Sequence, residues 1–342
     1  MTIKTHDILF TAPGVAELVA SEKELTPTGA NVLVKTEFTA VSAGTERDNL
    51  MGEFHINGDI KNCHVNFPRQ LGYSGIGTVI AIGPACKQVK VGDRVIIHFG
   101  KHTAYNLVPE SKVFPLMDGI SPEEAALIVI ASFPIEGVRK ARLELGESAM
   151  VMGLGILGLI GIQLCRIAGA APVIAADPNP ERRTLALTLG ADYALDSTAP
   201  DFAETVKSLT GGAGVNVVVD SAGVAAATIA AFDCMARFGR MTLLGCTRHA
   251  DVYDFYHAIH APGVTVIGAN NSARPQYESQ PGNWTGRDDC MALQRLLRGG
   301  RLSFEKLISE IHSPANAPEV YARLAEGKFP IGVLFDWKQL EA

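Results

Sequence analysis

The sequence has no surplus of positive charge. Its 342 residues carry 30 lysines and arginines against 36 aspartates and glutamates, a formal net charge of −6. A protein that binds nucleic acid usually presents a basic surface to the phosphates. We therefore expect no nucleic-acid partner.

The sequence also lacks the marks of secretion. Residues 1–6 have neither the basic nor the apolar section of a signal peptide. The six cysteines form no CxxC pair and show no framework spacing; they are Cys63, Cys86, Cys165, Cys234, Cys246 and Cys290. The simplest expectation is a reducing cytoplasm.

No apolar run is convincing as a membrane span. Residues 149–176 are hydrophobic, but they include Gln163, Arg166 and several glycines, so we interpret them as a buried strand and helix and expect no membrane partner. With 47% hydrophobic and 19% charged residues, the composition is typical of a globular α/β enzyme. The length suggests about two domains.

A glycine-rich turn is the most informative feature present. The apolar run 148–152 predicts a strand, and Gly153, Gly155 and Gly158 follow it at the spacing GxGxxG. The first glycine permits a tight turn, the second admits a pyrophosphate close to the backbone, and the third lets a helix pack on the strand. With Ile156 and Leu157 between them, these residues are expected to bind a dinucleotide on the helix N-terminus.

An acidic residue then suggests which dinucleotide binds. Asp177 ends the next apolar run, nineteen residues after Gly158. A carboxylate there can accept hydrogen bonds from the adenosine ribose hydroxyls and repels a 2'-phosphate, so NAD is favoured over NADP. Arg182 and Arg183 follow closely and could instead bind that phosphate. A packing unit with no ligand remains the alternative.

Two parts of the chain differ in their pattern of apolar residues. Up to about residue 115 the segments are short and β-branched, which predicts a mostly β domain with strands at 31–35, 76–82 and 94–98. From Ser121, an expected helix N-cap, helices and buried strands alternate, which predicts a doubly wound parallel sheet. Its later strands are expected at 215–220, 240–245 and 263–268, and a final strand is expected at 331–335.

Ligands bind such sheets at the carboxyl ends of the strands. Further cofactor contacts are therefore expected directly after these later strands, at Ala222, Gly223, Gly245, Cys246, Gly268, Ala269 and Asn270. Arg274, in the polar segment that follows, could recognise an anionic or hydroxylated substrate; a surface arginine is the plainer interpretation.

Five motifs together resemble the medium-chain dehydrogenase/reductase superfamily, which includes the zinc alcohol and polyol dehydrogenases. They are Ala43-Gly-Thr-Glu46, Gly72-Tyr-Ser-Gly-Ile-Gly77, Val91-Gly-Asp-Arg-Val95, the glycine turn and Asp220-Ser-Ala-Gly223. The resemblance implies a GroES-like, mostly β catalytic domain at residues 1–129 and 271–342, and a Rossmann domain with a doubly wound parallel sheet at 130–270. It also implies an active site in a cleft, and a homodimer or homotetramer.

The sequence departs from the zinc members where they bind metal. Their catalytic ligands correspond to Ala43, Tyr73 and Ile128, and none of these can replace a cysteine or histidine in a tetrahedral zinc site. The lobe of four cysteines that holds a structural zinc is missing between His98 and Val108. We expect neither zinc.

Without a Lewis acid, side chains must stabilise the reacting oxygen. The resemblance assigns Thr45 to the substrate oxygen and Glu46 to a supporting carboxylate. Tyr73 could act as an acid or base if its pKa is lowered, and His102 could relay a proton. The plainer alternatives are a turn threonine, a glutamate paired with Arg47 or another cation, a packing tyrosine and a solvated loop histidine.

Two enzymatic functions and one binding function stay open. The first is NAD-dependent hydride transfer between nicotinamide and a secondary alcohol or ketone, such as a sugar, cyclitol or polyol, which Asp177 favours. The second is reduction of an enone or quinone, which the missing metal favours. The third is a non-catalytic nucleotide-binding protein.

Overall fold

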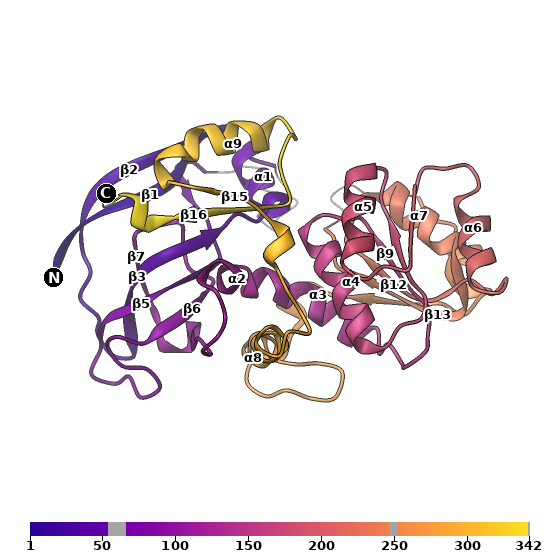
Figure 1. The fold of residues 1–342 in the computed structure, drawn as a ribbon. Helices are drawn as coiled ribbons and strands as arrows, with labels where there is room; N and C mark the ends of the chain where they lie inside the picture. Colours follow the sequence, from indigo (N-terminus) through magenta and orange to yellow (C-terminus); the bar gives the residue numbers. More distant parts are fainter. Residues whose placement is uncertain (54–65, 247–251, 341–342) are drawn as a thin grey trace. The chain divides into compact units, whose positions relative to one another are not determined.

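The computed structural model describes residues 1–53, 66–246 and 252–340. Two compact units make up the chain, one of Met1–Ile130 with Ser303–Ala342 and the other of Ala131–Leu302 (Figure 1). The chain was expected to re-enter the first domain at residue 271. In the structure, residues 271–302 belong to the second unit. Ion pairs from Arg274 to Glu136 and Asp289 hold this segment there.

Two β-sheets form most of the first unit. The smaller has the order β2-β1-β4, and the larger has the order β15-β16-β3-β5-β6-β8, with β7 pairing with β3. The strands are β1 (Thr2–Ala12), β2 (Val15–Glu24), β3 (Asn31–Ala40), β4 (Arg69–Gln70), β5 (Ser74–Ile82), β6 (Arg94–His98), β7 (Tyr105–Pro109), β8 (Val113–Pro115), β15 (Ile308–His312) and β16 (Gly332–Asp336).

Short helices complete the first unit. They are α1 (Ala43–Met51), α2 (Pro122–Ala126), α9 (Ala317–Ala325) and the start of α3 (Ile128–Lys140). As expected, Ser121 caps α2, where its hydroxyl accepts a hydrogen bond from the Glu124 N–H at 3.3 Å. The Glu124 carboxylate in turn accepts the Phe304 N–H at 2.8 Å. The returning chain is thereby tied to α2.

A six-stranded parallel sheet forms the second unit, in the order β11-β10-β9-β12-β13-β14. The strands are β9 (Ala149–Met152), β10 (Val173–Ala176), β11 (Tyr193–Leu195), β12 (Val215–Asp220), β13 (Met235–Leu243) and β14 (Thr265–Gly268). β13 begins five residues before the strand expected at 240, and the other expected strands of this sheet are confirmed within two residues. The doubly wound parallel sheet predicted from the sequence is therefore confirmed.

Helices cover both faces of this sheet. On one face, Gly161 of α4 (Ile156–Ala168) lies against Val151 and Pro134 of α3. On the other, a buried cluster joins Met150 and Met152 to Phe202 of α6 (Phe202–Leu209) and Ala231 of α7 (Ala225–Asp233). The remaining helices are α5 (Pro180–Thr188), which contacts α4, and α8 (Gly286–Arg298).

The carboxyl ends of the strands meet at one edge of the sheet. Met152 pairs with both Ala176 and Asp220, and Leu243 pairs with both Asp220 and Gly268. The strand order reverses between β9 and β12, and ligands of doubly wound sheets bind at such a point.

None of the helices within the described ranges combines the length and the apolar character that crossing a bilayer requires.

Candidate functional site

The glycine turn leads from β9 into α4. Gly153 adopts a left-handed φ of 84°, which favours glycine. Gly155 is the N-cap residue of α4, and the half-buried Ile156 and Leu157 open the helix. The first backbone N–H groups of a helix suit an anionic oxygen.

Each glycine of the turn meets a different local constraint. A Cβ at Gly158 would lie 1.9 Å from the Gly153 carbonyl oxygen, and one at Gly153 would lie 2.7 Å from the Ala222 Cα. A Cβ at Gly155 would meet nothing within 4 Å. Two of the glycines therefore allow close packing, and the third leaves its side of the turn open. This geometry fits a pyrophosphate beside the backbone.

Asp177 lies directly after β10 and is 4% exposed. One carboxylate oxygen accepts the Leu154 N–H at 2.7 Å, and the other accepts the Asn179 N–H at 2.8 Å. An ionised carboxylate has about four acceptor sites, so capacity for ribose hydroxyls remains. Asp177 thus connects the glycine turn to the next strand as well as offering negative charge.

The two arginines after Asp177 differ in their contacts. Arg183 donates to the carbonyl oxygens of Asp177 and Pro178, and it lies 3.4 Å from the Asp196 carboxylate. Arg182 lies 3.9 Å from the Asp177 carboxylate, and its side chain is 37% exposed. Arg182 is therefore the better placed of the two to meet a 2'-phosphate.

The residues expected after β12 and β13 also lie close together. Gly223 has a φ of 65°, and a Cβ on Gly245 would lie 2.4 Å from the Gly223 nitrogen. The exposed Cys246 follows. The Asp220 carboxylate accepts the Ala222 N–H at 3.1 Å and the Thr228 hydroxyl at 2.5 Å. Burial nevertheless raises the pKa of Asp220 above its ordinary value.

The Lys140 side chain holds the turn after β14. The Lys140 ammonium donates to the Gly268 carbonyl oxygen at 3.1 Å and to the Ala273 carbonyl oxygen at 3.0 Å. Between these two bonds lie Ala269, which is buried, and Asn270, whose side chain accepts the Ser272 N–H. Lys140 therefore fixes both ends of the turn.

Arg274 does not have the position expected of a substrate-recognition residue. Its side chain is 5% exposed and forms ion pairs with Glu136 at 2.5 Å and Asp289 at 3.1 Å. Asp289 also pairs with Arg139 at 2.8 Å. With both carboxylates engaged, Arg274 anchors residues 271–302 and offers no charge to a ligand.

In the first unit, three hydroxyl groups gather at the start of α1. The Tyr73 phenol donates to the Ser42 hydroxyl at 2.6 Å, and its ring stacks on Phe99 with centroids 5.6 Å apart. The Thr45 hydroxyl also interacts with the phenol. Thr45 is exposed while Ser42 is buried, so the cluster runs from the interior towards the surface.

The pKa of the Tyr73 phenol is shifted in the direction opposite to the one that base catalysis requires. Removal from water raises the pKa well above its ordinary value, and the negative charge of Glu46 adds to this, while the hydrogen bonds with Ser42 and Thr45 oppose it. Tyr73 is therefore a neutral hydrogen-bond donor around neutral pH, and the lowered pKa considered from the sequence is not found.

Glu46 and His102 form a buried pair next to Ser42 of the hydroxyl cluster. The His102 Nε2 atom lies 3.2 Å from the Glu46 carboxylate, and both side chains are 1% exposed. Glu46 also accepts the Tyr321 phenol at 2.6 Å and the Ser42 N–H at 2.9 Å. Burial alone would raise the pKa of Glu46, but His102, Tyr321 and the Ser42 N–H outweigh it and lower that pKa.

This pair corrects the expectations for His102 and decides between the partners considered for Glu46. His102 is enclosed by Thr39, Tyr321 and Phe335, so it is neither a solvated loop histidine nor placed to relay a proton to water. Glu46 pairs with His102 and not with Arg47, which donates to the Ala325 carbonyl oxygen. Both residues support α1 from within.

The positions that match zinc ligands in the resembling enzymes hold other groups. Ala43 is the first residue of α1, Tyr73 belongs to the hydroxyl cluster, and Ile128 is a fully buried first residue of α3. A methyl group, a phenol and a butyl side chain do not form the donor set of a tetrahedral zinc site.

Sequence reasoning missed three partners of this region. Ser42 accepts the Tyr73 phenol, Tyr321 bonds Glu46, and Trp337 donates to the Thr39 hydroxyl at 2.9 Å. Ser42 could have been found, because it directly precedes the Ala43-Gly-Thr-Glu46 motif. Tyr321 and Trp337 come from the end of the chain and carried no signal.

Two family models match the chain. Residues 29–118 match the alcohol dehydrogenase GroES-like domain, and residues 157–280 match the zinc-binding dehydrogenase model. The chain is 29% identical to D-guloside 3-dehydrogenase of Escherichia coli, over 78% of this chain and 77% of that one. It is 27% identical to L-threonine 3-dehydrogenase of Pyrococcus horikoshii, over 90% and 92%.

Solved structures share the whole fold. An oxidoreductase/dehydrogenase of unknown specificity from Escherichia coli has a TM-score of 0.84 at 20% identity, covering 98% of this chain and 99% of that one. A zinc-binding dehydrogenase-type protein from Sinorhizobium meliloti, solved with NADP, has a TM-score of 0.81 at 22% identity, covering 98% and 99%. Both confirm the expected α/β fold.

The glycine turn can be tested with two substitutions in one helix. We expect Gly158→Ala to abolish measurable NADH binding, because its methyl group would overlap the Gly153 carbonyl oxygen. The control is Gly161→Ala, where a Cβ makes only ordinary contacts of 3.7 Å or longer; helix propensity predicts a gain of up to about 1 kcal/mol in stability. Fluorescence titration with NADH and thermal unfolding would measure both. Equal NADH affinity in the two variants contradicts the assignment.

The buried Glu46 carboxylate predicts a specific pH dependence of stability. Because the pKa of Glu46 is lowered on folding from 4.5, its contribution is fully present above that pH and is lost as the pH falls through the lowered pKa. Glu46→Gln should reduce the free energy of unfolding at neutral pH by about 3–5 kcal/mol and flatten the acid limb. Urea unfolding from pH 3 to 8 would show this. A loss no larger than in Glu22→Gln, an exposed control in the same unit, would argue against it.

Proposed function

The chain belongs to the medium-chain dehydrogenase/reductase superfamily, and from that premise we propose that it transfers a hydride between NAD and a secondary alcohol or ketone without catalytic zinc. It is a nicotinamide-dependent dehydrogenase. The substrate class we propose is a sugar, cyclitol or other polyol. D-Guloside, L-threonine and sorbitol, named in three relatives, are all hydroxylated small molecules.

The hydroxyl cluster of Ser42, Thr45 and Tyr73 is the observation that carries this proposal. It lies where two of the zinc-ligand positions fall, and it offers neutral donors in place of a metal. A hydrogen-bond donor aimed at the substrate oxygen can stabilise the charge that develops there. We assign Thr45 and Tyr73 to that oxygen and Ser42 to orienting the phenol.

The residues act differently in the two directions of reaction. Bound NAD(H) supplies or accepts the hydride. In ketone reduction, the Tyr73 phenol turns its proton from Ser42 to the substrate oxygen and regains a proton from solvent through the exposed Thr45 hydroxyl. In alcohol oxidation, the phenol must first be ionised to accept the alcohol proton, and the raised pKa of Tyr73 opposes this at neutral pH.

Asp177 supports NAD over NADP. Its carboxylate is negative and fixed by two backbone N–H groups, and a 2'-phosphate beside it would be repelled. Arg182 favours NADP instead, because its exposed guanidinium could bind the 2'-phosphate.

Enone or quinone reduction is the second candidate. It is favoured by the replacement of the zinc ligands by Ala43, Tyr73 and Ile128, because such a reduction needs no Lewis acid to activate an alcohol. We further propose a homodimer or homotetramer in the cytoplasm, on the resemblance and the cysteine pattern alone.

A nicotinamide absorbance assay separates the two candidates. Sugars, cyclitols and secondary alcohols would be supplied with NAD, and the matching ketones, enones and quinones with NADH. We expect turnover on alcohols and ketones, with alcohol oxidation increasing from pH 7 to 10 because of the raised pKa of Tyr73. Turnover on enones or quinones alone would replace the proposal by the second candidate.

Removal of one phenol tests the proton donor. Tyr73→Phe should lower turnover by about 10-fold or more, the lower range of acid–base contributions, with the ring still stacked on Phe99. The control is Tyr321→Phe, which removes a hydroxyl bonded to Glu46 and should reduce stability while leaving turnover close to the parent value. Full activity of Tyr73→Phe would make Tyr73 a packing residue.

Asp177→Ser tests the choice of dinucleotide. We expect NADH affinity to fall and NADPH affinity to rise, so that their ratio changes by about 10-fold or more, equivalent to about 1.4 kcal/mol. Arg182→Met should weaken NADPH alone. Because Asp177 also holds Leu154, the ratio of the two affinities is the informative quantity. An unchanged ratio in Asp177→Ser rejects the role.

A further inference from the structure

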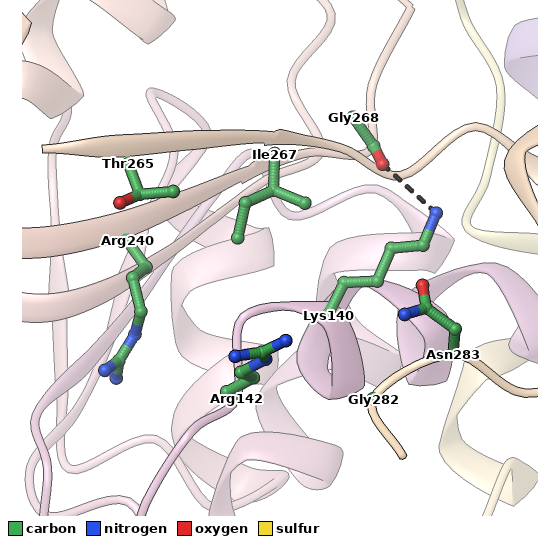
Figure 2. Close-up of a pocket in the computed structure, with 8 residues that line it drawn as sticks. All are labelled: Lys140, Arg142, Arg240, Thr265, Ile267, Gly268, Gly282 and Asn283. Carbon is green, nitrogen blue, oxygen red and sulfur yellow. Dashed lines mark hydrogen bonds between the residues drawn. The ribbon is translucent and has the colours of Figure 1, made fainter. Parts of the chain in front are cut away.

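A cavity of about 500 Å³ lies within the second unit. Arg240 of β13 and Thr265 of β14 are paired neighbours in its wall. Figure 2 shows Ile267, Lys140 and Arg142 around the same space. Pockets for small molecules have volumes of about 300–1,000 Å³, so this one could hold a small metabolite.

Hydrogen-bond donors form part of the lining of this cavity. Lys140, Arg142 and Arg240 contribute three cationic groups. Glu136 pairs with Lys140 at 2.7 Å, and Glu147 pairs with Arg240. The side chain of Arg142 is exposed and forms no ion pair with any residue that the structure describes. Arg142 therefore brings to the cavity a positive charge that no described carboxylate pairs with.

The Arg240 side chain also has donor capacity to spare. Its Nε atom is buried and has no hydrogen-bond partner among the described residues. Buried polar atoms are nearly always hydrogen bonded, so such an exception points to a missing group. The Arg240 side chain would have to move to bring this donor to an acceptor in the cavity, because the atom itself has almost no accessible surface.

The backbone of Arg142 is an independent indication. Arg142 has a φ of 49°, in the left-handed region that glycine occupies more readily than a long side chain. Backbone outliers of this kind persist mainly where the side chain has a function. Gly282 lies opposite, where a Cβ would be 3.7 Å from the Arg142 Nε atom.

We propose that this cavity binds a small anionic metabolite with a phosphate or carboxylate group, with Arg142 as its main contact. The guanidinium can hold either group through two parallel hydrogen bonds. Thr265 and Asn283 add polar groups, and Ile267 supplies an apolar wall for a carbon skeleton. Gly268 lines this cavity and is also an expected cofactor contact, so the proposed site adjoins the dinucleotide site; it contains none of Ser42, Thr45 and Tyr73.

The test is calorimetric titration of the full chain with inorganic phosphate and with citrate. Saturating NADH would be present, so that the glycine turn is already filled. At least one anion should bind saturably at one site per chain, and Arg142→Met should weaken it by about 10-fold or more. Arg298→Met, which removes an exposed arginine at the end of α8, should bind as the parent does.

A second variant separates binding from stability. Arg142→Gly relieves the left-handed backbone, so it should raise the unfolding temperature while losing anion affinity. Saturable binding by neither anion would overturn the proposal. So would unchanged affinity in Arg142→Gly, or an equal loss of affinity in Arg298→Met.

Discussion

The close approach of α4 to the turn after β9 is the constraint on which the cofactor site depends. With no side chain at Gly158, the helix backbone reaches the Gly153 carbonyl oxygen, and the turn then lies against Ala222. The carboxyl ends of the neighbouring strands, which are aligned by the parallel register, bring Asp177, Gly223 and Gly245 to the same edge. A bulkier residue at position 158 would push α4 away from the turn after β9. The open space beside Gly155, which fits a pyrophosphate, would then change shape.

In the first unit, buried polar side chains rather than close backbone packing position the candidate catalytic residues. A buried pair of side chains, Glu46 with His102, supports the start of α1; the Tyr321 phenol donates to Glu46, and the Thr39 hydroxyl bonds the second ring nitrogen of His102. The Tyr73 phenol occupies one position that matches a metal ligand in the resembling enzymes, and the hydroxyl groups of Ser42 and Thr45 flank a second, Ala43. The negative charge of Glu46 and the burial of the phenol keep Tyr73 protonated. The same pair that stabilises the helix therefore makes Tyr73 a proton donor.

The sequence pattern predicted those parts of the fold that depend on residues close together in the chain. The glycine spacing, the apolar runs and the acidic residue at 177 gave the parallel sheet and its strands, because each depends on neighbours in sequence. His102 and Arg274 could not be placed in this way. Glu46 lies 56 residues from His102, and Glu136 lies 138 residues from Arg274; only the folded chain brings these charges together. An exposed polar loop and a buried ion pair look alike in sequence.

The central claim is that hydroxyl groups replace the metal, and the most direct measurement is zinc content together with turnover on one sample. The purified enzyme would be dialysed against a chelator, its zinc measured by mass spectrometry, and its rate measured with NAD and the best alcohol of the panel. We predict undiminished turnover with far less than one zinc per chain. Turnover that falls with the zinc content and returns on adding zinc would contradict the account.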